Sequence, residues 1–192
     1  MPGDRPTMVW LIRHGEADGM KGRCCGWSDA PLSAEGIEQA KRVAAQLAVE
    51  PLSKVYSSNL ERAFRTAQIV AEPHGLVVEK ISELAEMHFG DLEGMTYEEA
   101  EERFPAVYQS WMTRPMETQF PNGEHFQEMK TRVLRTFDLI VQRHSGESIG
   151  IVAHAGVNRI VLGRTMSIPE SEMFQLPQPH CAVSRIDCRR GL

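Results

Sequence analysis

The chain has 192 residues, of which 42% are hydrophobic and 24% charged, and its formal net charge is −5 at pH 7. This length predicts a single domain, residues 1–192, with room for a full core. The acidic balance, with a sequence pI near 5.8, argues against a nucleic-acid-binding protein, which usually carries a basic face. No apolar stretch is long enough to cross a membrane, and the polar N-terminus shows no signal peptide. We therefore expect a cytoplasmic protein without a nucleic-acid or membrane partner.

The cysteines and the scattered histidines show no metal-ligand spacing. Cytosolic chemistry keeps thiols reduced, so we expect four free cysteines, with a disulfide between the two pairs as the alternative. We also expect neither a metal ion nor a cofactor. The residues concerned are Cys24, Cys25, Cys181 and Cys188, and His74, His88, His125, His144 and His180.

In the first third of the chain, the pattern predicts two strands separated by a helix. Residues 8–12 are apolar and β-branched, as is typical of a strand buried in a parallel sheet. Turn residues fill positions 19–26. Ser33 is a suitable N-cap for a helix whose apolar residues recur at helical spacing as far as Leu47. Residues 54–58 then predict a second strand that ends in small polar side chains.

The middle of the chain predicts a helix over residues 60–72 and a weak strand over residues 77–81. Three prolines interrupt residues 83–126, so we expect mostly loop and short helix there. This segment and the loop 18–29 are where we expect substrate specificity to arise. An apolar wall for a bulky leaving group is one interpretation of a set of large side chains, and simple core or lid packing is the other. The set is Met95, Tyr97, Tyr108, Trp111 and Met112.

The last third predicts a helix over residues 124–143, a buried strand over 149–153, a helix over 157–166 and an edge strand over 183–186. Strands and helices alternate along the whole chain. This alternation is typical of an α/β sandwich with a largely parallel sheet.

Two of the predicted buried strands stop abruptly at a histidine that is followed by small residues, at His14 and at His154. In open α/β sheets, ligands bind beyond the carboxyl ends of the strands. If the two strands lie side by side, both imidazoles face one pocket. The planar, positively charged guanidinium group of Arg13 is suited to binding phosphate there. The pattern indicates covalent phosphoryl chemistry on a histidine. The alternative for each histidine is a structural role with its nitrogens satisfied in the core.

Two further side chains are candidates for this pocket. Arg62, one turn into the helix over 60–72, can point back over the carboxyl edge of the sheet, where helix N-termini favour anions. Arg65 on the same helix is expected to be solvated.

Hydrolysis needs a proton source for the leaving oxygen and then a base for water, and one carboxyl group can serve as both. Glu86 is our candidate for this work. Spacing alone does not separate it from Glu83 or Glu93, and His88 competes with it on the same loop.

Five ordered blocks of sequence resemble the histidine phosphatase superfamily, in its phosphoglycerate-mutase-like branch, and together they span about residues 8–187. The blocks are Arg13-His14-Gly15-Glu16, Gly26-Trp27-Ser28-Asp29-Ala30-Pro31-Leu32-Ser33, Ser57-Ser58-Asn59-Leu60-Glu61-Arg62-Ala63, Glu86-Met87-His88-Phe89-Gly90-Asp91-Leu92-Glu93-Gly94 and Val152-Ala153-His154-Ala155-Gly156.

The resemblance implies a three-layer α/β/α fold and a phosphohistidine intermediate on His14. It further implies a phosphate pocket of Arg13, Arg62 and His154, with Glu86 as general acid and base. We also count Gly26, which opens the second block, among the substrate-binding residues.

The sequence departs from the family pattern at three places. No asparagine or similar donor follows Arg13-His14-Gly15-Glu16, so Lys21, Arg23 or a backbone N–H must supply that phosphate contact. His125 replaces the serine of the family's P-x-G-E-S stretch. The chain is also too short for the longer middle segment and tail of the cofactor-dependent mutases. This favours a phosphatase, since a mutase must shield its phosphohistidine from water.

The resemblance thus implies a metal-independent phosphomonoesterase, a histidine acid-type phosphatase acting on a small phosphorylated metabolite. Among named substrates, α-ribazole 5′-phosphate is the one we expect for a small member of this size. The alternative within the family is a phosphoglycerate mutase, because the Gly26-Trp27 pair locally resembles the mutases. A non-catalytic protein that binds a phosphorylated ligand is the alternative outside enzymes. The sequence does not fix the oligomeric state, and a homodimer stays open.

Overall fold

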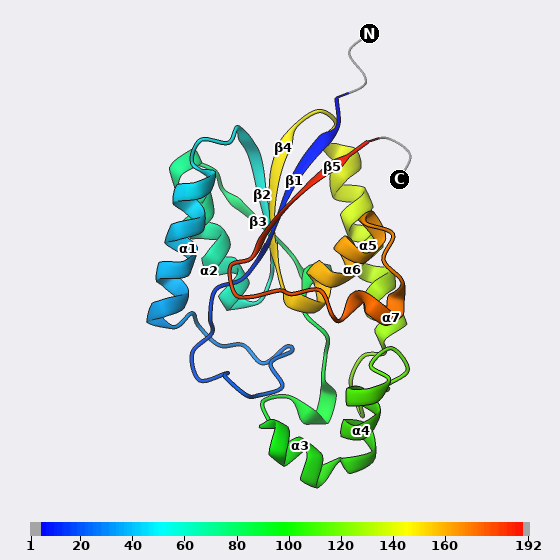
Figure 1. Cartoon of the computed structure of the whole chain (residues 1–192). Helices are drawn as coiled ribbons and strands as arrows, with labels where there is room; N and C mark the ends of the chain where they lie inside the picture. The colour runs from blue at the N-terminus through cyan, green and yellow to red at the C-terminus, as the bar shows by residue number, and fades with distance from the viewer. Residues whose placement is uncertain (1–4, 190–192) are drawn as a thin grey trace.

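The computed structural model describes residues 5–189 as a five-stranded sheet with helices on both faces (Figure 1). The strand order is β3-β2-β4-β1-β5, and β5 alone runs antiparallel to its neighbour. This confirms the predicted three-layer α/β/α sandwich with a mostly parallel sheet. The strands are β1 (Thr7–Arg13), β2 (Leu52–Ser58), β3 (Val78–Ile81), β4 (Ser148–Ala153) and β5 (Val183–Cys188).

β1 and β4 lie side by side in the centre of the sheet, as predicted. Their parallel register pairs Ile12 with Val152 and Arg13 with Ala153, so both strands end level with each other. The backbone N–H of His14 donates to the carbonyl of Ala153 at 3.0 Å, which continues the pairing by one residue. His14 and His154 therefore leave the sheet at the same edge.

Four helices cover the two faces of the sheet. Helices α1 (Ala34–Leu47) and α2 (Glu61–Ala71) pack on one face, and α5 (Phe126–Arg143) and α6 (Ala155–Thr165) pack on the other (Figure 1). Each face buries its own apolar cluster, since alternate residues of a strand point to opposite sides. Ser33 caps α1, as predicted, by accepting a hydrogen bond from the backbone N–H of Gly36 at 3.0 Å.

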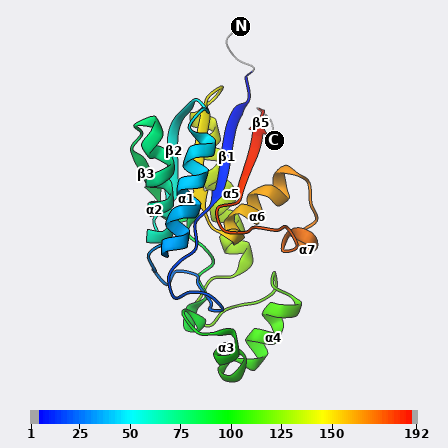
Figure 2. The same cartoon turned by 60° about the vertical axis from the view of Figure 1, so that its left-hand side comes forward.

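The segment between β3 and α5 contains more helix than its three prolines indicate. Helices α3 (Tyr97–Arg103) and α4 (Pro105–Thr113) form a separate layer beyond the carboxyl edge of the sheet (Figure 2). A capping box between Thr96 and Glu99 starts α3, and Pro105 stands in the first turn of α4, where its missing N–H costs nothing. Proline thus begins a helix here instead of breaking one.

Several element boundaries differ by a few residues from the prediction. Helix α5 begins at Phe126 because the His125 side chain caps it, and α6 begins at Ala155, immediately after His154. The short helix α7 (Glu170–Met173) has no periodic signal and was not predicted. The 3-10 turns are η1 (Glu72–His74), η2 (Ser82–Leu84) and η3 (Gly90–Leu92).

Over residues 5–189, no helix is long and apolar enough to span a membrane. Within that same range, no group of three His, Cys, Asp or Glu side chains is arranged to hold a metal ion. The four cysteines are free thiols.

Candidate active site

The ends of β1 and β4 bring the two predicted histidines together. The ring centroids of His14 and His154 lie 4.9 Å apart in an edge-on arrangement, and both side chains are buried. A cavity of about 550 Å³ reaches His14 from solvent, and Arg13 and Glu86 also line it. Arg62 and His154 lie against His14 on the protein side of this cavity, each with none of its surface exposed. The structure therefore gathers all five predicted chemical side chains at one edge of the sheet.

The hydrogen bonds of His14 fix its tautomer. Its Nδ1 lies 2.7 Å from the carbonyl oxygen of Gly15, and a carbonyl only accepts, so Nδ1 carries the proton. Nε2 is then the unprotonated nitrogen, and it accepts a hydrogen bond from Nε of Arg62 at 3.3 Å. Burial, followed by the charges of Arg62 and Arg13, holds the pKa of His14 well below its ordinary 6.5. The ring is thus neutral, with a lone pair on Nε2, as a nucleophile requires.

Arg62 is held in place by backbone carbonyls of the loop that precedes α1. Its Nη1 donates to the carbonyl of Ser28 at 2.8 Å and its Nη2 to that of Gly26 at 2.6 Å. Gly26 lies behind Arg62 and is not among the residues that line the cavity, so its observed contact is with the guanidinium. A Cβ at Gly26 would stand 2.2 Å from the carbonyl oxygen of Met87, which explains why the loop needs glycine here. Arg65 is exposed, as expected.

Two buried nitrogens at the site have no hydrogen-bond partner. Arg13 donates through Nη1 to the carbonyl of Gln178, but its Nε is orphaned. His154 contacts the hydroxyl of Ser58 through Nε2 at 2.8 Å, whereas its Nδ1 is orphaned. Among the described residues only one other buried side-chain atom, Nε2 of His74, shares this condition. Buried polar groups are normally satisfied, so this pair is consistent with a site that receives an anion.

Glu86 enters the cavity beside the start of α6. Its Oε2 accepts from the backbone N–H of Gly156 at 3.0 Å and its Oε1 from that of Met87 at 3.1 Å. Gly156 stands in the first turn of α6, so one of the free N–H groups at the start of this helix holds the carboxyl group in position. A Cβ at Gly156 would lie 2.4 Å from Oε1 of Glu86, so the glycine leaves room for the carboxylate.

The structure separates Glu86 from the residues that competed with it in the sequence. Glu83 is exposed, and the carboxylate of Glu93 accepts hydrogen bonds from the backbone N–H groups of Trp27 and Phe89. The His88 ring packs on Trp27 at a centroid distance of 4.7 Å. None of the three lines the cavity that reaches His14.

The cavity holds more positive charge than the sequence motifs indicated. Lys21 and Arg23 line it, which places both candidates for the missing asparagine donor beside the site. Arg159 and His180 line it too, and sequence reasoning missed both. The His180 ring lies 5.7 Å from that of His14, and burial lowers its pKa.

The two missed residues differ in how visible they were. Arg159 lies on α6, four residues and about one turn after Ala155. A helix predicted to begin at residue 155 would therefore have given a weak indication that Arg159 lies near the carboxyl edge of the sheet. His180 follows an irregular segment before β5, for which the sequence gives no signal.

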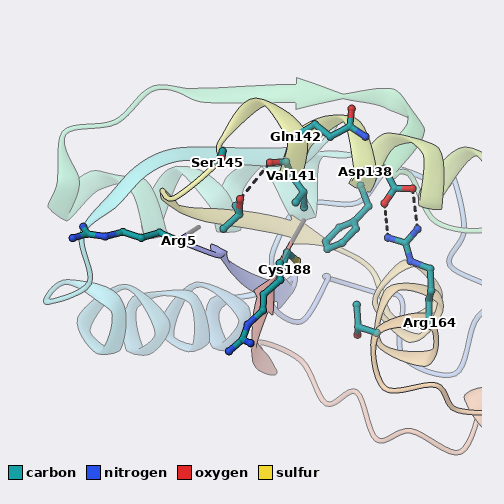
Figure 3. A pocket seen from close by; sticks show the side chains of 11 residues that line it. Arg5, Asp138, Val141, Gln142, Ser145, Arg164 and Cys188 are labelled. Atoms are coloured by element: carbon teal, nitrogen blue, oxygen red, sulfur yellow. Dashed lines mark hydrogen bonds and ion pairs between the residues drawn. The ribbon is translucent and has the colours of Figure 1, made fainter. Parts of the chain in front are cut away.

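Another cavity, of about 470 Å³, lies where β1 begins and β5 ends, which is the opposite edge of the sheet (Figure 3). The guanidinium of Arg164 is paired there with the carboxylate of Asp138 through hydrogen bonds of 2.6 and 2.9 Å. None of the predicted site residues lines this cavity. The cavity at the carboxyl edge, which His14, Arg13 and Glu86 line, is therefore the candidate active site.

Comparison with known proteins identifies the family to which the chain belongs. The family model of the histidine phosphatase superfamily (branch 1) matches residues 9–192. An adenosylcobalamin/alpha-ribazole phosphatase of Salmonella typhimurium is 32% identical over 189 residues, which cover 95% of this chain and 91% of the relative. Phosphoserine phosphatase 1 of Hydrogenobacter thermophilus is 34% identical over 177 residues, with 92% and 84% covered.

A solved structure, that of YhfR from Bacillus stearothermophilus, superimposes with a TM-score of 0.89 at 30% sequence identity. The alignment covers 94% of this chain and 91% of that protein. The arrangement of layers and strands described above is therefore that of the family.

Proposed function

Because the chain belongs to branch 1 of the histidine phosphatase superfamily, we propose that it hydrolyses phosphate monoesters through a phosphohistidine intermediate on His14. One observation carries the proposal. Nδ1 of His14 is committed to the Gly15 carbonyl, so Nε2 is the unprotonated nitrogen, held by Nε of Arg62 until phosphorus takes its lone pair, and His14 lines one cavity with Arg13 and Glu86. Neutral imidazole in this tautomer is a competent nucleophile toward phosphorus.

In the first step, Nε2 of His14 attacks phosphorus and the bond to the alcohol oxygen breaks. Glu86, protonated at this stage, gives its proton to the leaving oxygen. Arg13, Arg62 and His154 stabilise the charge on the remaining phosphoryl oxygens, so the protein contributes mainly positioning and electrostatics. The phosphorylated ring keeps its Nδ1–H on the Gly15 carbonyl.

In the second step, the Glu86 carboxylate takes a proton from water as the water oxygen attacks phosphorus. The bond between phosphorus and Nε2 breaks, inorganic phosphate leaves, and His14 returns to its neutral state. Glu86 is protonated again, so the cycle closes with water as the co-reactant and an alcohol and inorganic phosphate as the products.

For the substrate, we propose a small phosphorylated metabolite. The relatives named above are an alpha-ribazole phosphatase and a phosphoserine phosphatase, so α-ribazole 5′-phosphate and phosphoserine are the first compounds to assay.

The experiment that tests the proposal is hydrolysis of p-nitrophenyl phosphate in EDTA across pH 5–8, with the parent protein and the His14→Ala variant. We expect turnover that survives EDTA and is lost in the variant. Near-normal activity of His14→Ala would refute the nucleophile. Phosphate exchange that requires bisphosphoglycerate, without net phosphate release, would identify a mutase instead. Tight phosphate binding without turnover of any ester would identify a binding protein.

A further inference from the structure

A small apolar chamber adjoins the candidate active site. Its volume is about 150 Å³, and aromatic and aliphatic side chains supply most of its walls. Several of these walls belong to the main core and are almost fully buried, with 1% of the surface exposed for each of Phe120, Phe126 and Met129. Trp111 and Phe174 close the chamber from the partly buried side. The chamber is thus preformed by packed residues.

The chamber and the phosphate cavity share a boundary. Both are lined by Glu86, Phe89, Trp111, Ala155 and Arg159, so the two spaces adjoin at these residues. Glu86 is the group that protonates the leaving oxygen in the proposed mechanism. The alcohol part of a substrate whose phosphorus sits at His14 therefore lies next to the chamber.

The size of the chamber limits what it can hold. An engineered apolar cavity of about 150 Å³ in another protein stays dry and binds benzene. A space of about 150 Å³ here, with few polar groups besides Glu86 and Arg159, is matched to one six-membered ring or a branched aliphatic group of that size. A highly hydroxylated alcohol would lose hydrogen bonds to water on entering it.

We propose that the preferred substrates are phosphate monoesters of alcohols that carry one compact apolar group, which occupies this chamber during phosphoryl transfer. The inference rests on the proposed phosphatase activity and narrows its substrate class. It assigns the apolar wall to a different set of residues from the one anticipated in the sequence. Trp111 belongs to both sets, whereas Met95, Tyr97, Tyr108 and Met112 do not line the chamber.

The test compares esters of primary alcohols, whose leaving oxygens differ little in intrinsic reactivity. Benzyl phosphate and cyclohexylmethyl phosphate carry the ring, and glycerol 1-phosphate and phosphoserine do not. We expect kcat/KM for the two ring-bearing esters to exceed that for glycerol 1-phosphate by about tenfold or more, as burial of one ring allows.

A variant that fills the chamber provides the matched comparison. Ile160 lines the chamber from α6, and we expect Ile160→Phe to remove the preference for benzyl phosphate while turnover of glycerol 1-phosphate persists. Leu139→Phe adds the same side chain on a surface site of α5, where Leu139 is 45% exposed, and should leave the preference intact. If Ile160→Phe does not fold, Phe174→Ala enlarges the chamber instead and should extend the preference to 1-naphthylmethyl phosphate.

The outcomes separate the two proposals. Hydrolysis of all four esters at similar kcat/KM, or a benzyl preference unchanged in Ile160→Phe, would overturn the chamber assignment and leave the phosphatase proposal standing. No hydrolysis of any ester would refute the phosphatase. In that case the chamber can be tested by binding of benzyl alcohol, monitored by tryptophan fluorescence. Quenching in the parent but not in Trp111→Phe would support the chamber assignment, and no quenching in the parent would refute that assignment as well.

Discussion

At the scale of single residues, the site depends on how a few nitrogens and oxygens are held. His14 is neutral and oriented because Nδ1 is tied to a carbonyl and the ring is buried beside two arginines. Glu86 is held by two backbone N–H groups and faces the cavity. The role assigned to each can be tested separately.

Replacing the proposed acid should make catalysis depend on the leaving group. In Glu86→Gln, we expect kcat for an alkyl phosphate such as benzyl phosphate to fall by about 10²-fold or more, since a poor leaving oxygen needs a proton. With p-nitrophenyl phosphate, whose leaving oxygen is stable as an anion, the first step should persist. A rapid-mixing assay would then show a burst of nitrophenolate followed by slow turnover.

An equal loss for both esters in Glu86→Gln, with no burst, would show that Glu86 is not the proton donor of the first step. Glu83→Gln is the matched control, since Glu83 is an exposed carboxylate outside the cavity.

We propose that Ser58 positions His154. Its hydroxyl lies 2.8 Å from Nε2 of His154 and also accepts a hydrogen bond from the backbone N–H of Leu60 at 3.2 Å. The hydroxyl proton can therefore go to Nε2, which places the proton of the ring on the unpartnered Nδ1, the donor that we propose for a phosphoryl oxygen. We expect Ser58→Ala to lower kcat about tenfold, as the loss of one hydrogen bond of about 1–1.5 kcal/mol implies, with a smaller change in KM.

Ser57→Ala is the control for this prediction, because Ser57 is equally buried but donates to a backbone carbonyl at 2.7 Å and does not bond to His154. Ser58→Thr, which keeps a hydroxyl group, should retain the kcat that Ser58→Ala loses. A tenfold loss in Ser57→Ala as well would point to general strand damage.

At the scale of elements, the strands and their ends were the most predictable features. Residues of β4 are buried on both faces, and those of β1 are buried on one face and mostly half-buried on the other, so each sequence is an apolar run. The end of that run marks His14 and His154 without any knowledge of the rest of the chain. The Ser33 cap of α1 is equally local. The same logic placed Arg62 near the start of α2.

Features that depend on distant parts of the chain were not predictable in the same way. The sequence predicts that Gly26 binds substrate, whereas the contact in the structure is between its carbonyl and Arg62. That contact forms only when the loop folds over α2. His180 reaches the cavity because β5 returns antiparallel beside β1, and no local pattern encodes that return. Helix α3 begins at the Thr96 cap and helix α4 at Pro105, and both residue types are equally typical of loops.

The start of α6 supports a prediction at this scale. In Gly156→Ala, the added Cβ meets Oε1 of Glu86 at 2.4 Å, so the carboxylate must leave its position. Alanine is otherwise favourable in a helix, so we expect the free energy of unfolding to change by no more than about 1 kcal/mol. We expect kcat for alkyl phosphates to fall at least about tenfold, measured beside urea unfolding.

Gly163→Ala on the same helix is the comparison, assayed with glycerol 1-phosphate, since the three atoms nearest to its Cβ all belong to the side chain of Met173 and none to Glu86. It should keep its kcat. Full activity in Gly156→Ala would mean that Glu86 does not need its present position.

At the scale of the whole molecule, a net charge of −5 coexists with a cavity lined by several cations. An anionic substrate is therefore attracted locally and not by the overall charge, and salt should weaken that attraction only modestly at half-buried Arg13. The cost of this arrangement is the burial of two neutral histidines between arginines.

That burial makes stability depend on pH. The pKa values of His14 and His154 are held well below 6.5 by burial first and then by Arg62. In the unfolded chain both residues take up protons as the pH falls through 6.5, whereas in the folded protein they stay neutral to lower pH. The unfolded state then binds more protons, so the free energy of unfolding must decrease as the pH is lowered below 6.5.

We expect urea unfolding to show this decrease between pH 7.5 and pH 5. In His14→Asn, whose amide can still donate to the Gly15 carbonyl, the decrease should be smaller, because one of the two histidines no longer titrates. The difference therefore reports the titration of His14 together with its share in lowering the pKa of His154, and both reduce the decrease in the variant. An identical decrease in the variant would contradict the depressed pKa.

The central claim is that a phosphoryl group is carried by His14, and trapping it is the most direct test. Glu86→Gln, mixed with p-nitrophenyl phosphate and quenched in alkali, should gain the mass of one phosphoryl group, and peptide mapping should place it on His14. Turnover by the parent protein with no such adduct in the variant, or an adduct on any other residue, would contradict the account.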